Sequence, residues 1–109
     1  MPFLELDDKT YLVDERGFLK EAKYWTEEFA IHLAKESEQG IPELTDQHWD
    51  LINGLRAYFL KCGRLPLVRH FCSEMRTKQH VLYELFPEGP YLGIAKIAGI
   101  PQSSKELNF

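Results

Sequence analysis

Apolar residues between Thr45 and Gly63 recur at helical spacing and predict the longest helix of the chain. Trp49, Ile52 and Leu55 are three residues apart, so they share one face of a helix. That face continues through Phe59 and is widened by Leu51, Tyr58 and Cys62. Because Thr45 suits an N-cap and Gly63 a stop, we expect a central core helix that is buried over a broad arc.

The same kind of pattern predicts a helix on each side of this central one. Thr26 is a plausible N-cap, the residues after it carry an apolar stripe that includes Phe29 and Leu33, and Gly40 ends the segment. On the other side, Pro66 suits the first position of a helix that runs to about Met75. The tight connection from Cys62 to Pro66 makes these two helices an angled pair.

Two further short helices are predicted at 78–86 and 91–98, because Pro87 and Pro90 interrupt an otherwise apolar, helix-prone run. Gly99 is the expected C-terminal stop. The residues after Pro101 are polar and too few to bury a face, so we expect a single domain over 1–101 and a flexible C-terminal arm over 102–109.

Alternation of apolar and polar residues near the start of the chain predicts short strands at 3–6 and 10–13. A turn at 14–17 then leads to Phe18 and Leu19. A small antiparallel β-meander fits this segment. The predicted fold is therefore α+β and mainly α, an array of about five helices with an N-terminal meander.

Charge is distributed unevenly along the chain, although the net charge is only −4. Residues 1–53 carry five Lys or Arg against thirteen Asp or Glu, whereas residues 54–80 carry six against one. Such a dipolar chain favours charge-matched docking over bulk nucleic-acid binding. There is no long apolar run, no secretory signal pattern, and no disulfide framework in two cysteines, so we expect a cytoplasmic protein without a membrane span.

Several segments together resemble one known family. They are LYELFPEGP at 82–90, KIAGIP at 96–101, DERGFL at 14–19, Trp25, Leu44-Thr45, His48-Trp49, Leu55-Arg56, Tyr58, Pro66 and Arg69. This set is similar to the DsrC/TusE proteins, the sulfur-relay family that includes the gamma subunit of dissimilatory sulfite reductase. The resemblance spans most of the chain and implies a DsrC-like fold.

The family resemblance also implies a sulfur carrier whose flexible arm bears a penultimate cysteine. In this chain, the position of that cysteine is occupied by Glu106 and the position of the second redox cysteine by Ala95. A carboxylate forms neither a persulfide nor a disulfide. The resemblance therefore implies a relative that docks on sulfite reductase or sulfurtransferase subunits without carrying sulfur on its arm.

The remaining candidate chemistry is sparse. Cys62 and Cys72 are the only thiols; we interpret both as buried core residues, and sulfur transfer on either one is an alternative hypothesis. His32, His48, His70 and His80 lack the paired spacing of metal ligands, and His48 is interpreted as structural. No phosphate loop, nucleophile elbow or glycine fingerprint is present. We therefore expect no metal, no cofactor and no catalytic residue.

Basic side chains in the middle third are the best functional candidates. They are Arg56, Lys61, Arg64, Arg69, Arg76 and Lys78, joined by Lys96 at the root of the arm. We predict that partner proteins bind at Arg56, Arg64, Arg69, Arg76, Lys78 and Lys96. The alternative from another class is a helix-turn-helix-like DNA-binding regulator whose recognition helix begins at Pro66, although the net acidity of the chain opposes DNA binding.

Overall fold

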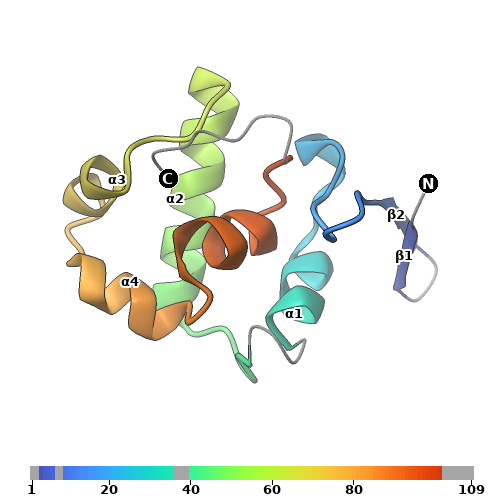
Figure 1. Cartoon of the computed structure of the whole chain (residues 1–109), viewed down its shortest axis with the longest axis horizontal. Coiled ribbons are helices and arrows are strands. Elements are labelled where there is room, and N and C mark those ends of the chain that lie inside the picture. Colours follow the sequence, from blue (N-terminus) through green and yellow to red (C-terminus); the bar gives the residue numbers. More distant parts are fainter. Residues whose placement is uncertain (1–2, 7–8, 36–39, 102–109) are drawn as a thin grey trace.

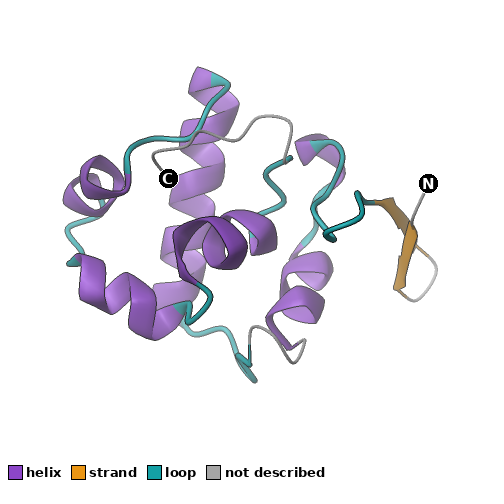
Figure 2. Cartoon of the chain, viewed as in Figure 1, coloured by secondary structure: helices purple, strands orange, loops and turns teal. Residues whose placement is uncertain are grey.

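The structure of the protein is a computed structural model, and it describes residues 3–6, 9–35 and 40–101. Within these ranges, four α-helices, a π-helix and a 3₁₀ turn are packed together, and a β-hairpin lies at one end of the molecule (Figures 1 and 2). In chain order the elements are β1 (Phe3–Leu6), β2 (Lys9–Leu12), η1 (Ala22–Tyr24), α1 (Glu27–Lys35), α2 (Asp46–Cys62), α3 (Val68–Glu74), α4 (Gln79–Leu85) and η2 (Pro90–Ala95). The predicted mainly helical α+β fold is confirmed.

The N-terminal β-structure is a hairpin followed by one further bridge. Strands β1 and β2 pair antiparallel with Phe3 opposite Leu12, and Val13 forms an isolated bridge with Leu19. The Asp14 carboxylate accepts hydrogen bonds from the backbone N–H of Arg16 and of Phe18, at 2.8 and 3.0 Å. This side-chain-stabilised turn reverses the chain and brings Leu19 back beside β2.

Helix α2 is joined to α4 through a buried histidine at its start. The backbone N–H of Thr45 donates to His48 Nδ1 at 3.0 Å. Nδ1 is therefore unprotonated, and Nε2 carries the hydrogen that is donated to the Leu85 carbonyl at 2.9 Å. The ring also meets Phe86 edge-on at 5.2 Å. His48 is a structural residue, as the sequence predicted, and it fixes the angle between the two helices.

Helix α1 begins as its sequence predicted. The Thr26 hydroxyl accepts a hydrogen bond from the backbone N–H of Phe29 at 3.2 Å, which satisfies a donor of the first turn. The buried face of α1 carries Phe29, Ala30, Leu33 and Ala34, each at most 2% exposed. The Phe29 ring lies 5.2 Å from that of Tyr11, so α1 and the hairpin share one core.

The segment η2 lies at the centre of the packed helices (Figure 1). Ile94, Ala95, Ile97 and Ala98 are fully buried, and Ile100 is 1% exposed. The sequence predicted an α-helix over 91–98, but the wider π-helical turn occupies Pro90–Ala95. The predicted stop is confirmed, because Gly99 has φ +74° and the N–H of Ile100 bonds the Ala95 carbonyl at 3.1 Å.

Two further local predictions from the sequence were wrong: the start of α3 and the broad burial of α2. Helix α3 begins at Val68, because Leu67 takes an extended backbone as its N-cap, and Pro66 is buried before the helix. The buried residues of α2 are His48, Leu51, Ile52 and Leu55. Trp49 and Phe59 are only partly buried, and Cys62 is exposed. The second half of α2 extends past the rest of the core (Figure 1), so its apolar stripe is not fully covered.

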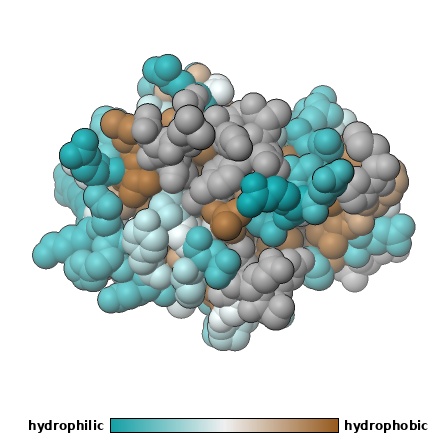
Figure 3. Space-filling model, in the orientation of Figure 1, coloured by the Kyte–Doolittle hydropathy of each residue, from teal (hydrophilic) through white to brown (hydrophobic). Residues whose placement is uncertain are grey.

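The surface carries hydrophobic side chains in separate patches among hydrophilic residues on the face shown in Figure 3. The most exposed large ones are Leu60, at 63%, and Phe3, at 62%. No helix in the described ranges is long and apolar enough to cross a membrane. The predicted arm at 102–109 lies outside the described residues.

Candidate functional site

Two side chains hold the arm root, which we define as residues 96–101. The Trp25 indole N–H donates to the Ile97 carbonyl at 2.8 Å. One guanidinium nitrogen of Arg56, on α2, donates to the Ala98 carbonyl at 2.9 Å and to the Ala22 carbonyl at 3.3 Å. The arm root is thus tied to η1 and α2 by consecutive carbonyl groups.

Trp25 and Arg56 also contact each other. The Arg56 guanidinium carbon lies 4.2 Å from the centre of the Trp25 ring, which is a cation–π stack. Burial lowers the pKa of Arg56 from its ordinary value by desolvation, but an arginine remains charged at neutral pH. Its carbonyl bonds are therefore charge-assisted, and Arg56 acts as a clamp within the fold.

Gly99 is required beneath the Trp25 ring. A Cβ atom at this position would lie 2.5 Å from Trp25 Cδ1 and 2.9 Å from Cγ. These ring atoms are close to the Trp25 backbone and have little freedom to move. The glycine therefore supplies both the positive φ and the space for the indole.

Lys96 is buried instead of standing free at the arm root. It is 8% exposed, and its ammonium nitrogen lies 5.8 Å from the centre of the Phe18 ring. A Cβ atom on Gly17 would lie 3.1 Å from Lys96 Cε, so the turn at 14–17 covers the side chain. Within the described ranges, no carboxylate forms an ion pair with Lys96.

The other four residues predicted to bind partners are exposed, either on α3 or on the connections before and after it. Arg64 follows the stop of α2, Arg69 is on α3, Arg76 follows α3, and Lys78 is the N-cap of α4. We call these four residues the basic surface. The structure thus separates the six predicted residues into two buried or half-buried ones at the arm root and four exposed ones. Partner binding by any of them stays a prediction.

Arg76 has a backbone conformation that L-residues seldom adopt. Its φ is +55°, and it is the one non-glycine residue with positive φ in the described part of the chain. The N–H of Thr77 bonds the Cys72 carbonyl at 2.9 Å, and the N–H of Arg76 bonds that of Ser73 at 3.1 Å. This is the C-terminal cap in which glycine is usual, and arginine here costs about 1 kcal/mol.

The two thiols lie in different surroundings, and neither is in the segment at 90–101. Cys72 is 3% exposed, and burial raises the pKa of its thiol. Cys62 is exposed at the end of α2. The interpretation of both cysteines as buried is therefore confirmed for Cys72 and wrong for Cys62. Ala95 is fully buried in η2, and Glu106 lies outside the described residues.

The segment predicted as a DNA recognition helix is short. Helix α3 has seven residues and buries Phe71 and Cys72. His70 Nε2 lies 3.2 Å from a carboxylate oxygen of Glu74, and both side chains are more than half exposed. A carboxylate on this exposed face opposes phosphate binding. DNA binding stays an untested alternative.

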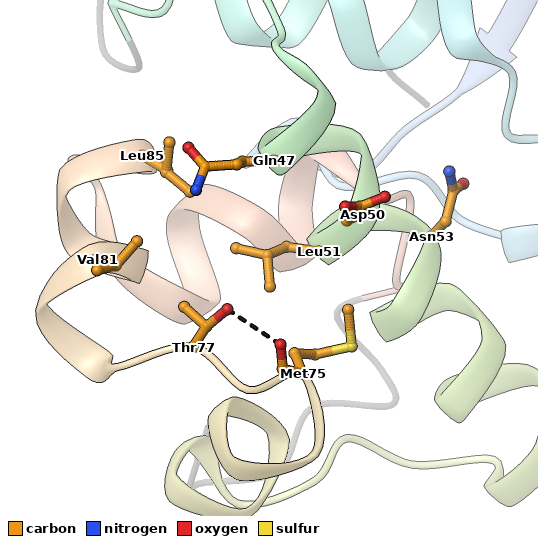
Figure 4. A pocket seen from close by; sticks show the side chains of 8 residues that line it. All are labelled: Gln47, Asp50, Leu51, Asn53, Met75, Thr77, Val81 and Leu85. Atoms are coloured by element: carbon orange, nitrogen blue, oxygen red, sulfur yellow. Dashed lines mark hydrogen bonds between the residues drawn. The ribbon is translucent and has the colours of Figure 1, made fainter.

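A groove between α2 and the α3–α4 pair was not predicted from the sequence. It has a volume of about 290 Å³ and is lined by Gln47, Asp50, Leu51, Asn53, Met75, Thr77, Val81 and Leu85 (Figure 4). The three polar residues of α2 are spaced three apart, which is the one signal that the sequence carries for this wall. In the described part of the chain, no three His, Cys, Asp or Glu side chains are grouped as metal ligands.

Known proteins of similar sequence and structure point to one family. The family model described as DsrC like protein matches residues 5–105. The gamma subunit of dissimilatory-type sulfite reductase from Nitratidesulfovibrio vulgaris is 39% identical over 94 residues, which are 86% of this chain and 88% of that protein. The sulfurtransferase TusE of Escherichia coli is 32% identical over 109 residues, covering 94% and 97% of the two chains.

A solved structure gives the same answer for the fold. The oxidized gamma subunit of dissimilatory sulfite reductase (DsrC) from Archaeoglobus fulgidus superposes with a TM-score of 0.83 at 38% sequence identity. The match covers 92% of this chain and 95% of that one. From its sequence, its helical fold and the matched family model, this chain belongs to the DsrC/TusE sulfur-relay family.

Proposed function

We propose that this chain is a non-catalytic, binding member of the DsrC/TusE family. It docks through the basic surface on sulfite reductase or sulfurtransferase subunits in the cytoplasm, and it competes with or regulates the sulfur carriers that use the same partners. The names of its relatives support this partner class, since one is a sulfite reductase subunit and another a sulfurtransferase.

The backbone of Arg76 is the observation that carries the docking part of this proposal. An exposed arginine stands where a glycine would relieve the strain of the positive φ. Strained backbone conformations cluster at functional sites, so the positive φ of Arg76 supports a role for its side chain. Since Arg69 is on α3 and Lys78 is the N-cap of α4, their charges add to the same basic surface on the two sides of Arg76.

The proposed loss of the carrier role follows from the residues at the arm root and beyond it. Sulfur transfer requires a thiolate that attacks or receives a sulfur atom. Ala95 offers a buried methyl group, and residue 106 is a glutamate. The clamp formed by Trp25 and Arg56 needs no thiol. A protein can therefore keep the docking fold and lose the sulfur chemistry.

The variant Arg76→Gly tests the docking proposal with two opposite readouts. We expect the free energy of unfolding to rise by about 0.5–1 kcal/mol, because glycine accepts the positive φ. Affinity for the partner should fall, with the larger loss at low salt. Partners would be captured from lysate on the immobilised protein, identified by mass spectrometry and titrated with salt after nuclease treatment.

Lys20→Glu is the control for a general charge effect, because Lys20 is exposed and far along the chain from the basic surface. It should leave retention of sulfite reductase or sulfurtransferase subunits nearly unchanged. Equal retention by Arg76→Gly and the unmodified protein would contradict docking at the basic surface. Retention that disappears with nuclease would instead support the DNA-binding alternative.

Sulfur transfer on Cys62 is a second candidate function, favoured by the exposure of that thiol. It predicts that a persulfide donor adds the mass of one sulfur atom to the protein and that Cys62→Ser abolishes the addition. Our proposal predicts no stable addition. Under the proposal, Glu106→Cys supplies the thiol that the family carries on its arm, and it should accept sulfur where the unmodified protein does not.

A further inference from the structure

The groove between α2 and the α3–α4 pair is a small site with two unlike walls. The wall on α2 carries Gln47 and Asp50, whereas Val81 and Leu85 on α4 form an apolar wall. Leu51, which is 3% exposed, lies between the walls in Figure 4. The hydrogen bond from His48 to the Leu85 carbonyl joins the two walls at one end. The groove is therefore built into the angle between the helices.

The polar groups of this groove are available as hydrogen-bond acceptors. Within the described ranges, the side chains of Gln47, Asp50 and Asn53 form no hydrogen bond or ion pair with other residues. The Thr77 hydroxyl donates to the Met75 carbonyl at 3.3 Å, which leaves its oxygen lone pairs able to accept. Asp50 is the one charged residue among those that line the groove. An occupant should therefore bring hydrogen-bond donors and a positive charge.

The size of the groove limits what it holds. Its volume of about 290 Å³ is at the lower end of ligand pockets, which span roughly 300–1,000 Å³. That space suits one long side chain better than a cofactor. The apolar wall favours a side chain with a methylene stem, which packs on apolar surface while its charged head reaches polar groups.

We propose that this groove binds an arginine side chain presented by a partner protein. The guanidinium donates to the Asp50 carboxylate and to the oxygen atoms of Gln47 and Thr77, and its stem packs against Val81 and Leu85. Arginine fits better than lysine because its planar, weakly hydrated head donates five hydrogen bonds in a fork and also packs on apolar surface. The fork matches a wall with several separate acceptors.

The arginine must be part of a polypeptide. A free amino acid brings a carboxylate, and no basic residue lines the groove to pair with it. Within a peptide chain, that carboxylate is replaced by a neutral amide. Arg76 and Lys78 flank Thr77 in the sequence, but neither lines the groove. The inference does not require that sulfite reductase or sulfurtransferase subunits are the partners.

The test is a titration of isotope-labelled protein with N-acetyl-arginine N-methylamide, followed by two-dimensional NMR. We expect saturable shifts of the backbone amides of Leu51, Thr77 and Val81, with a dissociation constant of about 1–10 mM for so small a probe. The matching citrulline derivative has nearly the same shape but no charge. It should shift these amides less at every concentration.

Asp50→Asn should weaken binding of the arginine probe about three- to fivefold, as expected for a partly exposed ion pair. Asp46→Asn is the matched control, because it removes the same charge one turn earlier on α2 from a residue that does not line the groove. It should leave the affinity within about a factor of 1.5. The inference is overturned by equal shifts with citrulline, by equal losses in the two variants, or by the absence of saturation.

Discussion

Arg56 and Arg69 both belong to the basic stretch of the sequence, yet they have opposite surroundings. Arg56 is half-buried, stacks on Trp25 and donates to two backbone carbonyl groups. Arg69 is exposed on α3. The first arginine stabilises the arm root, whereas the charge of the second is exposed to solvent. A cluster of like charges in a sequence therefore contains residues in separate environments, and only the tertiary contacts distinguish them.

The largest expected effect compares two glycines with the same backbone angle. Gly99 and Gly63 both have φ +74°, but a Cβ on Gly63 would meet nothing within 4 Å. Gly63→Ala should cost about 1 kcal/mol for the positive φ alone. Gly99→Ala should cost about 2–4 kcal/mol, because the Trp25 ring must also shift. Urea unfolding measures the free energy of unfolding of both variants. Equal losses would mean that the arm root accommodates the added methyl group without a costly shift of Trp25.

Replacing each arginine by methionine tests the opening comparison directly. Arg56→Met keeps most of the stem but leaves the Ala98 carbonyl without its donor, so we expect a loss of about 1.5–3 kcal/mol. Arg69→Met should change the free energy of unfolding by less than about 0.5 kcal/mol, as for an ordinary surface residue. Comparable losses in the two variants would remove the distinction between the clamp and the basic surface.

Trp25→Phe separates the hydrogen bond of the indole from its aromatic face. The variant keeps a ring for Arg56 to stack on but removes the donor to the Ile97 carbonyl, at a cost of about 1 kcal/mol. Trp49→Phe is the control, since the Trp49 indole forms no hydrogen bond with the described residues. Amide hydrogen exchange at residues 98–100 should accelerate in the Trp25 variant only.

The smallest effect concerns the two cysteines. Because burial raises the folded-state pKa of Cys72, this thiol contributes stability below its unfolded pKa of about 8.5. That contribution is lost as the pH rises from there toward the folded value. Unfolding free energies from pH 7 to 9.5 should therefore fall less steeply for Cys72→Ala than for Cys62→Ala, which retains Cys72. Equal pH dependence of the unfolding free energy in the two variants would contradict a raised pKa of Cys72 in the folded protein.

Helix positions and stops were largely readable from the sequence, because they depend on neighbouring residues. Thr26 as an N-cap and Gly63 and Gly99 as stops are local features, and the structure has them as predicted. The start of α3 was misplaced, because proline favours the first turn of a helix but does not require one. The π-helical turn of η2 depends on packing at the centre of the molecule, which no local pattern records.

The candidate site was predictable only in part, for a related physical reason. No local pattern indicates that Lys96 is covered by the turn at 14–17 or that Arg56 lies on Trp25. Contacts of this kind join residues up to 79 positions apart in the chain, and hydrophobic periodicity carries no information about them. Arg76 was predicted to bind partners because of its charge, whereas its left-handed backbone is visible only in the folded chain.

The π-helical turn has a consequence for how this segment tolerates insertions and deletions. A π-helical turn holds one more residue than the α-helical turn that could replace it. Removal of a single residue within Pro90–Ala95 would permit an ordinary α-helical turn, and later residues would keep their angular position around the axis, because the turn that replaces the π-helical one holds one residue fewer. The carbonyl groups of Ile97 and Ala98 would then still face Trp25 and Arg56. The same deletion in α2 would instead rotate every later residue by about 100°, so the two segments should differ in their tolerance of a lost residue.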